Sequence, residues 1–293
     1  MGVSTHPSRY RPDAPPDYSH RFHAGNVGDV WKHCALVTLL ARLAATAGRV
    51  TFLDTHAGEG RYPLAPTGEW TGGIGRLWRV AVPDESEGVS RYLALCRGLA
   101  AGGERPSAYP GSPLFARAVL GPGAPLVLWE RDPEACERLR ENLAGDPAAR
   151  VVCADGLADL DTAARAAESE AGRVVVLVDP PYSQKAEWTA VADAVASAVR
   201  RTQRACIVLW YPVKSLTRPN AMMARLEAAG VSGTFAELVT TPLAHQRQRL
   251  NGSGVLLVRP PKGALAALAA AAPALGTHCA TRSGVWSLRV VSR

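Results

Sequence analysis

The sequence predicts an α/β fold with a mostly parallel sheet, and this prediction depends on two observations. Short apolar runs alternate with segments of helical periodicity along the 293 residues, and the run at 174–178 consists only of valine and leucine. Such a continuous run is typical of a central strand that is buried on both faces. Acidic residues follow several of the runs, at the carboxyl ends of strands where open α/β sheets bind their ligands.

The expected strands cover 50–54, 126–130, 150–155, 174–178, 206–212, 235–241 and 254–259, with a last strand within 284–291. The expected helices cover 29–47, 89–100, 114–120, 133–144, 184–202, 219–229 and an alanine-rich stretch, 263–276. Ser112 is a natural N-cap, and Pro113 a natural first residue, for the helix that ends at 120. We expect Pro273 to break the alanine-rich stretch, which should form a helix packed on the surface rather than one that crosses a membrane.

The chain is expected to divide into a main domain with one insertion. Residues 1–17 are rich in proline and predict a flexible N-terminal extension. In a simple βαβ unit the second strand ends about 20 residues after the glycine turn, whereas here it begins only at residue 126. We therefore expect a helical subdomain at 61–108, inserted into a domain formed by 18–60 and 109–293.

Composition sets broad limits on the class of protein. Hydrophobic residues make up 47% of the chain, enough for a core, and the net charge of +7 favours an anionic partner. The six cysteines, at 34, 96, 136, 153, 206 and 279, are scattered without a Cys-x-x-Cys pair, so we expect free buried thiols in a reducing compartment. We see no apolar signal core and no membrane-spanning run, and we expect a cytoplasmic protein.

The stretch Asp179-Pro-Pro-Tyr182 follows the central strand and is the strongest chemical signal. Asp179 and the carbonyl of Pro180 can each accept a hydrogen bond from an exocyclic amine, and Tyr182 can stack on the base that carries it. The motif resembles that of amino-methyltransferases, with Asp179, Pro180 and Tyr182 as catalytic residues. The alternative is that the two prolines only end a strand and Tyr182 is a core aromatic.

Acids at the other strand ends suggest a nucleoside site. Glu130 suits ribose hydroxyls and Asp155 the adenine amine of a cofactor, because a buried acid needs a partner. Gly58 and Gly60, after the strand that ends at Asp54, would let a cofactor approach the backbone. The helix N-terminus at Ser112 could hold a carboxylate, although plain capping explains that residue equally well.

Two polar segments are candidates for contact with a substrate. Tyr18, His20, His23 and Asn26 precede the first helix, in which Lys32 and His33 follow. For each histidine, ordinary structural hydrogen bonding is the alternative. The loop at 242–253 carries basic residues, of which Arg247 and Arg249 are expected to contact phosphate, with a solvated hairpin loop as the alternative.

Several motifs taken together resemble a known family from Tyr18 onward. They are Phe22-His-Ala-Gly-Asn26, Lys32-His33, Asp54-Thr-His-Ala-Gly-x-Gly-Arg-Tyr62, Tyr109-Pro-Gly-Ser-Pro113, Asp155-Gly156, Asp179-Pro-Pro-Tyr182 and Trp210-Tyr-Pro212. The family is the bacterial ribosomal RNA large subunit methyltransferase J family, which methylates adenine N6 in 23S ribosomal RNA. The chain departs from it in residues 1–17, in the basic loop before Gly252 and in the alanine-rich C-terminal region.

The resemblance implies a Rossmann-like methyltransferase fold with a seven-stranded sheet, and S-adenosylmethionine (SAM) as the cofactor. The residues expected to bind the cofactor are Lys32, His33, Asp54, His56, Gly58, Ser112, Glu130, Asp155, Gly156 and Asp179. The expected partner is large-subunit ribosomal RNA, bound by a monomer without a metal ion.

Other function classes remain as alternatives. The same motif would serve an adenine-N6 DNA methyltransferase, and a degenerate site would leave a non-catalytic RNA-binding module. A metal-dependent hydrolase could use His20, His23, His33 and His56 with Asp54. That last hypothesis leaves the remaining strand-end acids and Tyr182 without a role.

Overall fold

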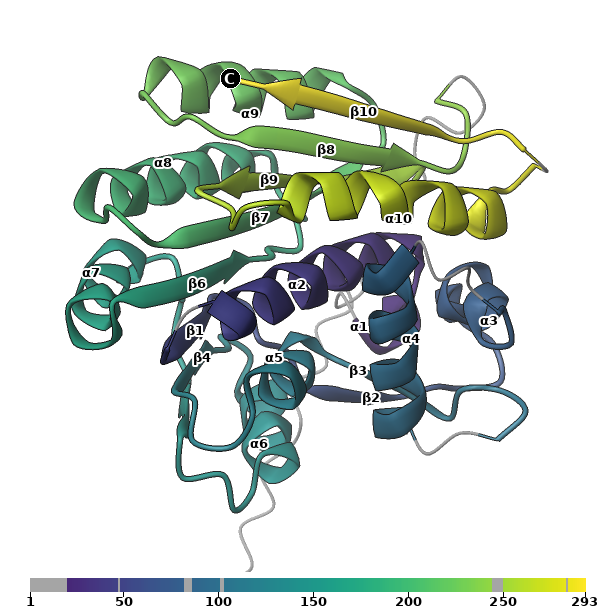
Figure 1. Cartoon of the computed structure of the whole chain (residues 1–293), viewed down its shortest axis with the longest axis horizontal. Helices are drawn as coiled ribbons and strands as arrows, with labels where there is room; N and C mark the ends of the chain where they lie inside the picture. The colour runs from purple at the N-terminus through teal and green to yellow at the C-terminus, as the bar shows by residue number, and fades with distance from the viewer. Residues whose placement is uncertain (1–19, 47, 82–85, 101–102, 244–249, 283) are drawn as a thin grey trace, which may run out of the picture.

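An eight-stranded sheet forms the centre of the computed structural model, which describes residues 20–46, 48–81, 86–100, 103–243, 250–282 and 284–293. Its strand order is β10-β8-β9-β7-β6-β1-β4-β5 (Figure 1). The strands are β1 (Val50–Asp54), β4 (Leu126–Trp129), β5 (Ala149–Val152), β6 (Arg173–Val178), β7 (Cys206–Val213), β8 (Thr234–Val239), β9 (Gly252–Val258) and β10 (Ser287–Ser292). Strands β5, β4, β1, β6 and β7 are parallel, and β9, β8 and β10 continue the sheet in antiparallel pairs. The α/β fold is therefore confirmed.

The resemblance implies a sheet of seven strands, and this count is wrong by one. The eighth strand is β10, whose residues pair with the free edge of β8, from Ser287 opposite Val239 to Ser292 opposite Thr234. The strand expected within 284–291 is thus present. An unpaired sheet edge exposes a row of backbone donors and acceptors, and β10 satisfies those of β8.

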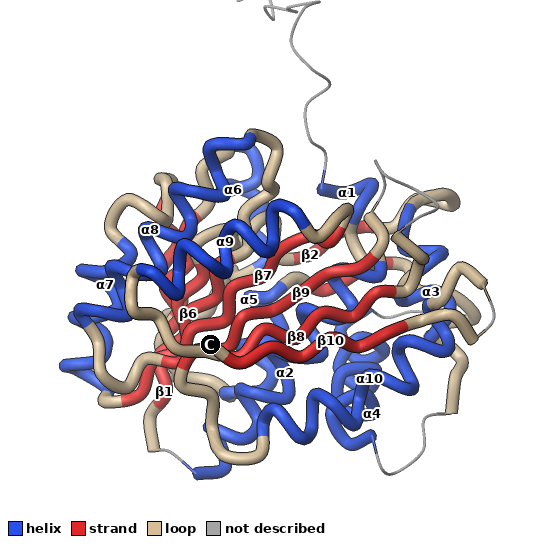
Figure 2. Tube along the Cα trace, turned by 90° about the horizontal axis from the view of Figure 1, so that it is seen from above, coloured by secondary structure: helices blue, strands red, loops and turns tan. Residues whose placement is uncertain are grey.

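Helices cover both faces of the sheet (Figure 2). They are α1 (His20–His23), α2 (Val27–Thr46), α3 (Ile74–Leu77), α4 (Glu87–Ala100), α5 (Ser112–Leu120), α6 (Pro133–Asn142), α7 (Leu160–Ala171), α8 (Lys185–Arg201), α9 (Thr217–Ala228) and α10 (Ala264–Cys279). Strand β6 lies between two hydrophobic clusters. Val175 and Leu177 join the cluster of α2, α4, α5 and α10, whereas Val174, Val176 and Val178 join that of α7, α8 and α9. The prediction of a strand buried on both faces is confirmed.

The segment 61–108 begins and ends in a two-stranded ribbon. Strands β2 (Arg61–Pro63) and β3 (Ala108–Pro110) pair antiparallel, and the 3₁₀ helix η1 (Glu69–Gly72), α3 and α4 lie between them in the chain. Helix α4 packs against α2 and α10, and its Tyr92 hydroxyl lies 3.0 Å from that of Tyr109. The segment therefore shares the core of the sheet's α2 side. The division of the chain into domains stays a prediction, and residues 1–17 lie outside the described part.

Two local expectations need correction. Gly111, not Ser112, is the N-cap of α5, because the Ser112 side chain bonds a buried carboxylate instead of the helix backbone. Pro273 does not interrupt the alanine-rich stretch, since α10 continues through it. Of the helices in the described ranges, none combines the length and apolar character that crossing a membrane requires.

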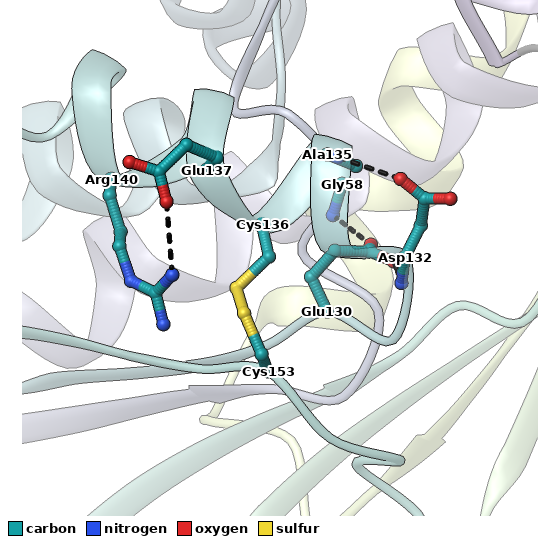
Figure 3. Close-up of a disulfide and its surroundings, with 8 residues drawn as sticks. All are labelled: Gly58, Glu130, Asp132, Ala135, Cys136, Glu137, Arg140 and Cys153. Atoms are coloured by element: carbon teal, nitrogen blue, oxygen red, sulfur yellow. Dashed lines mark hydrogen bonds and ion pairs between the residues drawn. A yellow bond between two sulfur atoms is a disulfide. The ribbon is translucent and has the colours of Figure 1, made fainter. Parts of the chain in front are cut away.

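The expectation of six free thiols is wrong for two of them, because Cys136 and Cys153 form a disulfide (Figure 3). Cys136 lies on α6, and Cys153 directly follows β5. The packing of α6 against β5 brings the two together, although 17 residues separate them in the chain. Cys34, Cys96, Cys206 and Cys279 are buried free thiols, as expected.

This disulfide predicts a measurable thiol count and a contribution to stability. In denaturant without a reductant, a thiol reagent should titrate four cysteines, and six after treatment with dithiothreitol. The Cys153→Ser variant should lose about 3 kcal/mol of unfolding free energy in urea under oxidising conditions, the value typical of a loop of this size. Six reactive thiols in oxidised protein would contradict the pairing.

Candidate active site

Four acidic residues lie at one edge of the sheet, because the strands that precede them are parallel neighbours. Asp54 ends β1, Glu130 follows β4, Asp179 follows β6, and Asp155 lies three residues after the end of β5. This is the carboxyl edge, where open α/β sheets bind ligands. The structure thus places together the four acids that the sequence pointed to.

Asp54 is fully buried and is held by two donors. The Ser112 hydroxyl donates to Asp54 Oδ2 at 2.6 Å, and the His56 backbone N–H donates to Oδ1 at 3.1 Å. Burial raises the pKa of Asp54 to about 6, and these two hydrogen bonds oppose the rise. Asp54 therefore fixes the N-terminus of α5 relative to the loop after β1.

The loop after β1 is held against Glu130. The N–H of Gly58 donates to Glu130 Oε2 at 2.9 Å, and the N–H of Asp132 donates to Oε1 at 2.8 Å. Gly58 has a left-handed φ of 62°, and a Cβ there would collide with the Tyr62 hydroxyl. The loop can therefore adopt this path only with glycine at 58, and the Glu130 carboxylate is fixed in place.

Asp155 and Gly156 close the same edge. Asp155 is exposed and accepts a hydrogen bond from the Leu157 N–H at 2.9 Å. A Cβ at Gly156 would collide with the carbonyl oxygen of Thr55, so glycine lets this turn pack on the loop after β1. Next to it, His56 Nδ1 lies 2.7 Å from the Thr55 hydroxyl, and burial lowers the pKa of His56 to about 4. His56 is therefore neutral at neutral pH.

Lys32 links α2 to the end of β6. Its Nζ lies 2.7 Å from Asp29 Oδ1 and 2.5 Å from Asp179 Oδ2, and its side chain is 3% exposed. Burial lowers the pKa of Lys32, but the charges of the two carboxylates outweigh this and hold the pKa above its usual value. Burial also raises the pKa of Asp179 to about 7, against the lowering by Lys32. Lys32 is thus the counter-ion of this cluster: it pairs with Asp29 and opposes the protonation of Asp179.

Tyr182 is packed tightly after the two prolines. Its φ is 50°, its hydroxyl donates to the Trp210 carbonyl at 3.0 Å, and its ring centroid lies 4.2 Å from that of Trp188. Only 6% of Tyr182 is exposed. The exposed part contributes to the wall of a cavity, so the residue is both a core aromatic and a boundary of the site.

That cavity, of about 1030 Å³, opens beside the Asp179 motif. Its lining residues are Phe22, His23, Asn26, Val27, Glu69, Thr71, Gly72, Arg76, Pro181, Tyr182, Trp188, Trp210, Pro212, Lys214, Ser215, Arg218, Pro219, Thr240, Thr241, Leu250, Cys279 and Thr281. Lys32 Nζ lies 5.5 Å from the ring centroid of Trp210, which connects the charged cluster to the cavity wall.

The remaining predicted residues lie in different places. His23 Nδ1 lies 2.9 Å from Glu69 Oε2, and Asn26 Nδ2 donates to the same oxygen at 2.9 Å, so both line the cavity while anchoring η1. His33 is buried away from them, with Nδ1 2.7 Å from the Tyr109 hydroxyl. His20 lies in α1. Tyr18, Arg247 and Arg249 are outside the described residues.

The metal-site hypothesis receives no support from these positions. His23, His33 and His56 contact Glu69, Tyr109 and Thr55 respectively, rather than one another. Within the described ranges, no three His, Cys, Asp or Glu side chains gather in a way that could hold a metal ion.

The sequence interpretation did not assign a role to several cavity residues. Trp210 belongs to the motif Trp210-Tyr-Pro212, and Arg76 belongs to the expected insertion, so the sequence drew attention to both. Lys214 and Arg218 carried none, because only the turn from β7 to α9 brings them to this cavity.

The Lys32 cluster predicts a large effect on stability. Replacing Lys32 by methionine leaves Asp29 and Asp179 buried without their cation, which should lower the unfolding free energy by about 3–5 kcal/mol. Urea denaturation monitored by circular dichroism measures this loss. Lys185→Met, at the exposed start of α8, is the matched control and should change stability by less than about 0.5 kcal/mol. Equal stabilities of the two variants would contradict the role of Lys32.

Comparisons with known proteins agree on one family for this chain. The family model "Ribosomal RNA large subunit methyltransferase D, RlmJ" matches residues 48–292. Ribosomal RNA large subunit methyltransferase J of Haemophilus influenzae is 34% identical over 250 residues, which cover 83% of this chain and 87% of that protein. The protein of the same name from Escherichia coli is 34% identical over 251 residues, with the same coverage.

A solved structure agrees with these sequence matches. The crystal structure of a Legionella pneumophila protein superimposes with a TM-score of 0.82 at 26% identity, covering 92% of this chain and 98% of that one. The fold, the edge of acidic residues and the matches over most of the chain lead to one conclusion: the chain belongs to the ribosomal RNA large subunit methyltransferase family RlmJ.

Proposed function

We propose that this protein transfers a methyl group from SAM to N6 of a specific adenine in 23S ribosomal RNA. Family membership supports the methyl transfer to ribosomal RNA. The observation that carries the choice of an exocyclic amine is the position of Asp179 and Pro180. They directly follow β6 at the ligand-binding edge, immediately before Pro181 and Tyr182 in the wall of the large cavity.

The residues at the sheet edge fit SAM. Glu130 is fixed by Gly58 and suits the ribose hydroxyls, the exposed Asp155 suits the adenine amine, and the backbone N–H of Ser112 at the start of α5 suits the carboxylate. SAM, when bound, supplies an electrophilic methyl group on a positively charged sulfur. Asp54 and Gly156 would support this site by holding the loop after β1.

Lys32, His33 and His56 complete the proposed cofactor site. Neutral His56 follows Thr55 in the loop after β1 and can offer an uncharged donor or acceptor. His33 is 2% exposed and packs against Tyr109 and Phe115, so its contribution is to hold the wall next to α5. Lys32 acts through Asp179, whose carboxylate it holds in one orientation.

In the proposed reaction, Asp179 and the Pro180 carbonyl accept hydrogen bonds from the two N–H groups of the target amine, and one of these protons leaves to solvent once N6 has gained the methyl group. The amine lone pair is delocalised into the ring, and two such hydrogen bonds favour a tetrahedral, more nucleophilic nitrogen. Most of the rate gain would come from holding this nitrogen in line with the transferred methyl group, because positioning alone can supply several kcal/mol. Lys32 lowers the pKa of Asp179 and so favours the ionised carboxylate, which accepts rather than donates.

The target base would enter the cavity and contact the wall of Tyr182. Tyr182, Trp188 and Trp210 form an aromatic group there, with ring centroids 4.2 and 6.2 Å from that of Tyr182. Aromatic walls suit a base that has been turned out of its helix or loop. His23 and Asn26 line the same space. Tyr18, His20, Arg247 and Arg249 remain predicted substrate contacts.

The alternative functions differ in which features of the candidate site they would use. A DNA methyltransferase would use the same Asp179 motif, and only the substrate assay separates it from the proposed activity. In a non-catalytic RNA-binding module the Lys32–Asp179 pair beside the cavity would have only its structural role. We further propose a monomer that acts in the cytoplasm, with 61–108 as an inserted subdomain.

Methyl transfer from labelled SAM to deproteinised large-subunit ribosomal RNA tests the proposed function. RNA from cells that lack the protein should give a stoichiometric N6-methyladenosine peak on nucleoside analysis. Asp179→Ala should reduce the rate at least about 100-fold, as loss of a preorganised contact does, while calorimetry shows SAM binding retained. Incorporation only into duplex DNA would overturn the substrate, and full activity of Asp179→Ala would overturn the mechanism.

The pKa of Asp179 predicts a pH dependence of activity. Because the ionised carboxylate is the acceptor, kcat/KM should rise as the pH increases through about 7 and then level off. The profile of kcat should show a lower inflection, since the positive charge of bound SAM stabilises the carboxylate. In Lys32→Met the inflection should move upward. A rate that is independent of pH between 5.5 and 8.5 would contradict this role; that range is about 1.5 pH units either side of 7.

A further inference from the structure

The cavity beside the Asp179 motif has two banks that come from different parts of the chain. One bank consists of α1, η1 and α3, and it includes Phe22, Glu69 and Arg76. The other consists of the end of β7 and the start of α9, with Lys214 and Arg218. The wall of Tyr182 and Trp188 belongs to neither bank and adjoins the catalytic motif. A ligand in this cavity therefore touches the reaction site and both banks.

The charge of the two banks favours an anionic ligand. Among the described lining residues, Arg76, Lys214 and Arg218 are permanent cations and Glu69 is the sole carboxylate. Glu69 is already bonded to His23 and Asn26, whereas Lys214 and Arg218 are exposed and have no ion-pair partner in the described part of the chain. Arg76 is exposed and uses one guanidinium nitrogen to donate to the Ala280 carbonyl, which leaves other donors free.

Aromatic groups on the same surface favour unpaired bases over other anions. Phe22 is 54% exposed, an unusual position for a large apolar side chain, and it lines the cavity. Cations along a groove with exposed aromatic rings are the combination that binds single-stranded nucleic acid, through phosphate contacts and stacking.

We propose that this cavity is the docking groove for a single-stranded segment of the RNA substrate. Lys214 and Arg218 contact phosphates on one side of the target nucleotide, Arg76 contacts a phosphate on the opposite bank, and Phe22 stacks on a neighbouring base. This inference rests on the proposed function, since it assigns the surface that holds the same RNA. In this arrangement the strand that carries the target adenine would lie across the carboxyl end of β6.

The test compares the Lys214→Gln/Arg218→Gln double variant with the intact protein on deproteinised large-subunit ribosomal RNA. The KM for RNA should rise by about tenfold or more, and the slope of log affinity against log salt should fall by about 1.4, as expected for two lost single-strand phosphate contacts. The kcat and the affinity for SAM should change little, because neither residue is among those proposed to bind SAM or to contact the reacting amine. Phe22→Ala should weaken RNA binding at least about fivefold, and Phe22→Trp should restore it.

A matched control removes two charges elsewhere. Arg200→Gln/Lys262→Gln alters exposed residues at the end of α8 and in the turn after β9, on the amino edge of the sheet. This control should retain the KM and the salt slope of the intact protein. An equal loss in the control would show a general charge effect and would overturn the groove.

Two further outcomes would also overturn the inference while leaving the proposed function intact. One is an unchanged KM for RNA in the Lys214→Gln/Arg218→Gln variant of an enzyme that methylates RNA. The other is a defect seen only with assembled ribosomal particles, which would indicate a protein partner.

An unstructured oligoribonucleotide should compete for the groove better than its duplex with the complementary strand, and the reverse order would contradict single-strand docking. Failure of the intact protein to methylate RNA would instead overturn the proposed function.

Discussion

The structure depends on the need to neutralise charge that is buried at the carboxyl edge of the sheet. Asp29 and Asp54 are buried there, and Asp179 is largely buried, close to the ammonium group of Lys32. Removing an ion from water costs several kcal/mol unless a partner of opposite charge is in contact. Lys32 bridges Asp29 and Asp179, and the bridge joins α2 to β6. The carboxylate proposed to receive the substrate amine is thereby held by the same contact that fixes the first long helix on the sheet.

A few close contacts likewise hold the loop after β1 in place. Its backbone donates to Glu130 through Gly58, Gly111 donates to the carbonyl of Gly60 at 2.7 Å, and Gly156 packs directly on Thr55. Glycine allows these close backbone approaches because a Cβ would occupy the contact. Three segments from distant parts of the chain are thus held at fixed positions around one ligand site. Preorganisation of this kind reduces the entropy that is lost when a cofactor binds.

The Cys136–Cys153 disulfide lies next to this region. Cys136 is on the helix that follows Glu130, and Cys153 precedes Asp155 by two residues (Figure 3). The two acids proposed to hold the nucleoside of SAM therefore flank a covalent link between α6 and β5. Cysteine spacing alone gave no indication of it, since neither cysteine belongs to a local pair and their contact depends on how α6 packs.

Local pattern was enough to predict most elements and the edge at which the site lies. The apolar run before Asp179, the acids after the other strands and the glycines at 58 and 60 are properties of short segments, and backbone geometry converts them directly into strand ends and turns. Contacts between distant segments were decided only by the tertiary structure. Lys32 and Asp179 are 147 residues apart, and the bond from Ser112 to Asp54 replaces the helix cap that local propensity favours. Lys214 and Arg218 reach the cavity because β7 ends beside Tyr182. Side-chain pairing across such separations depends on packing and desolvation of the whole chain, which no local periodicity encodes.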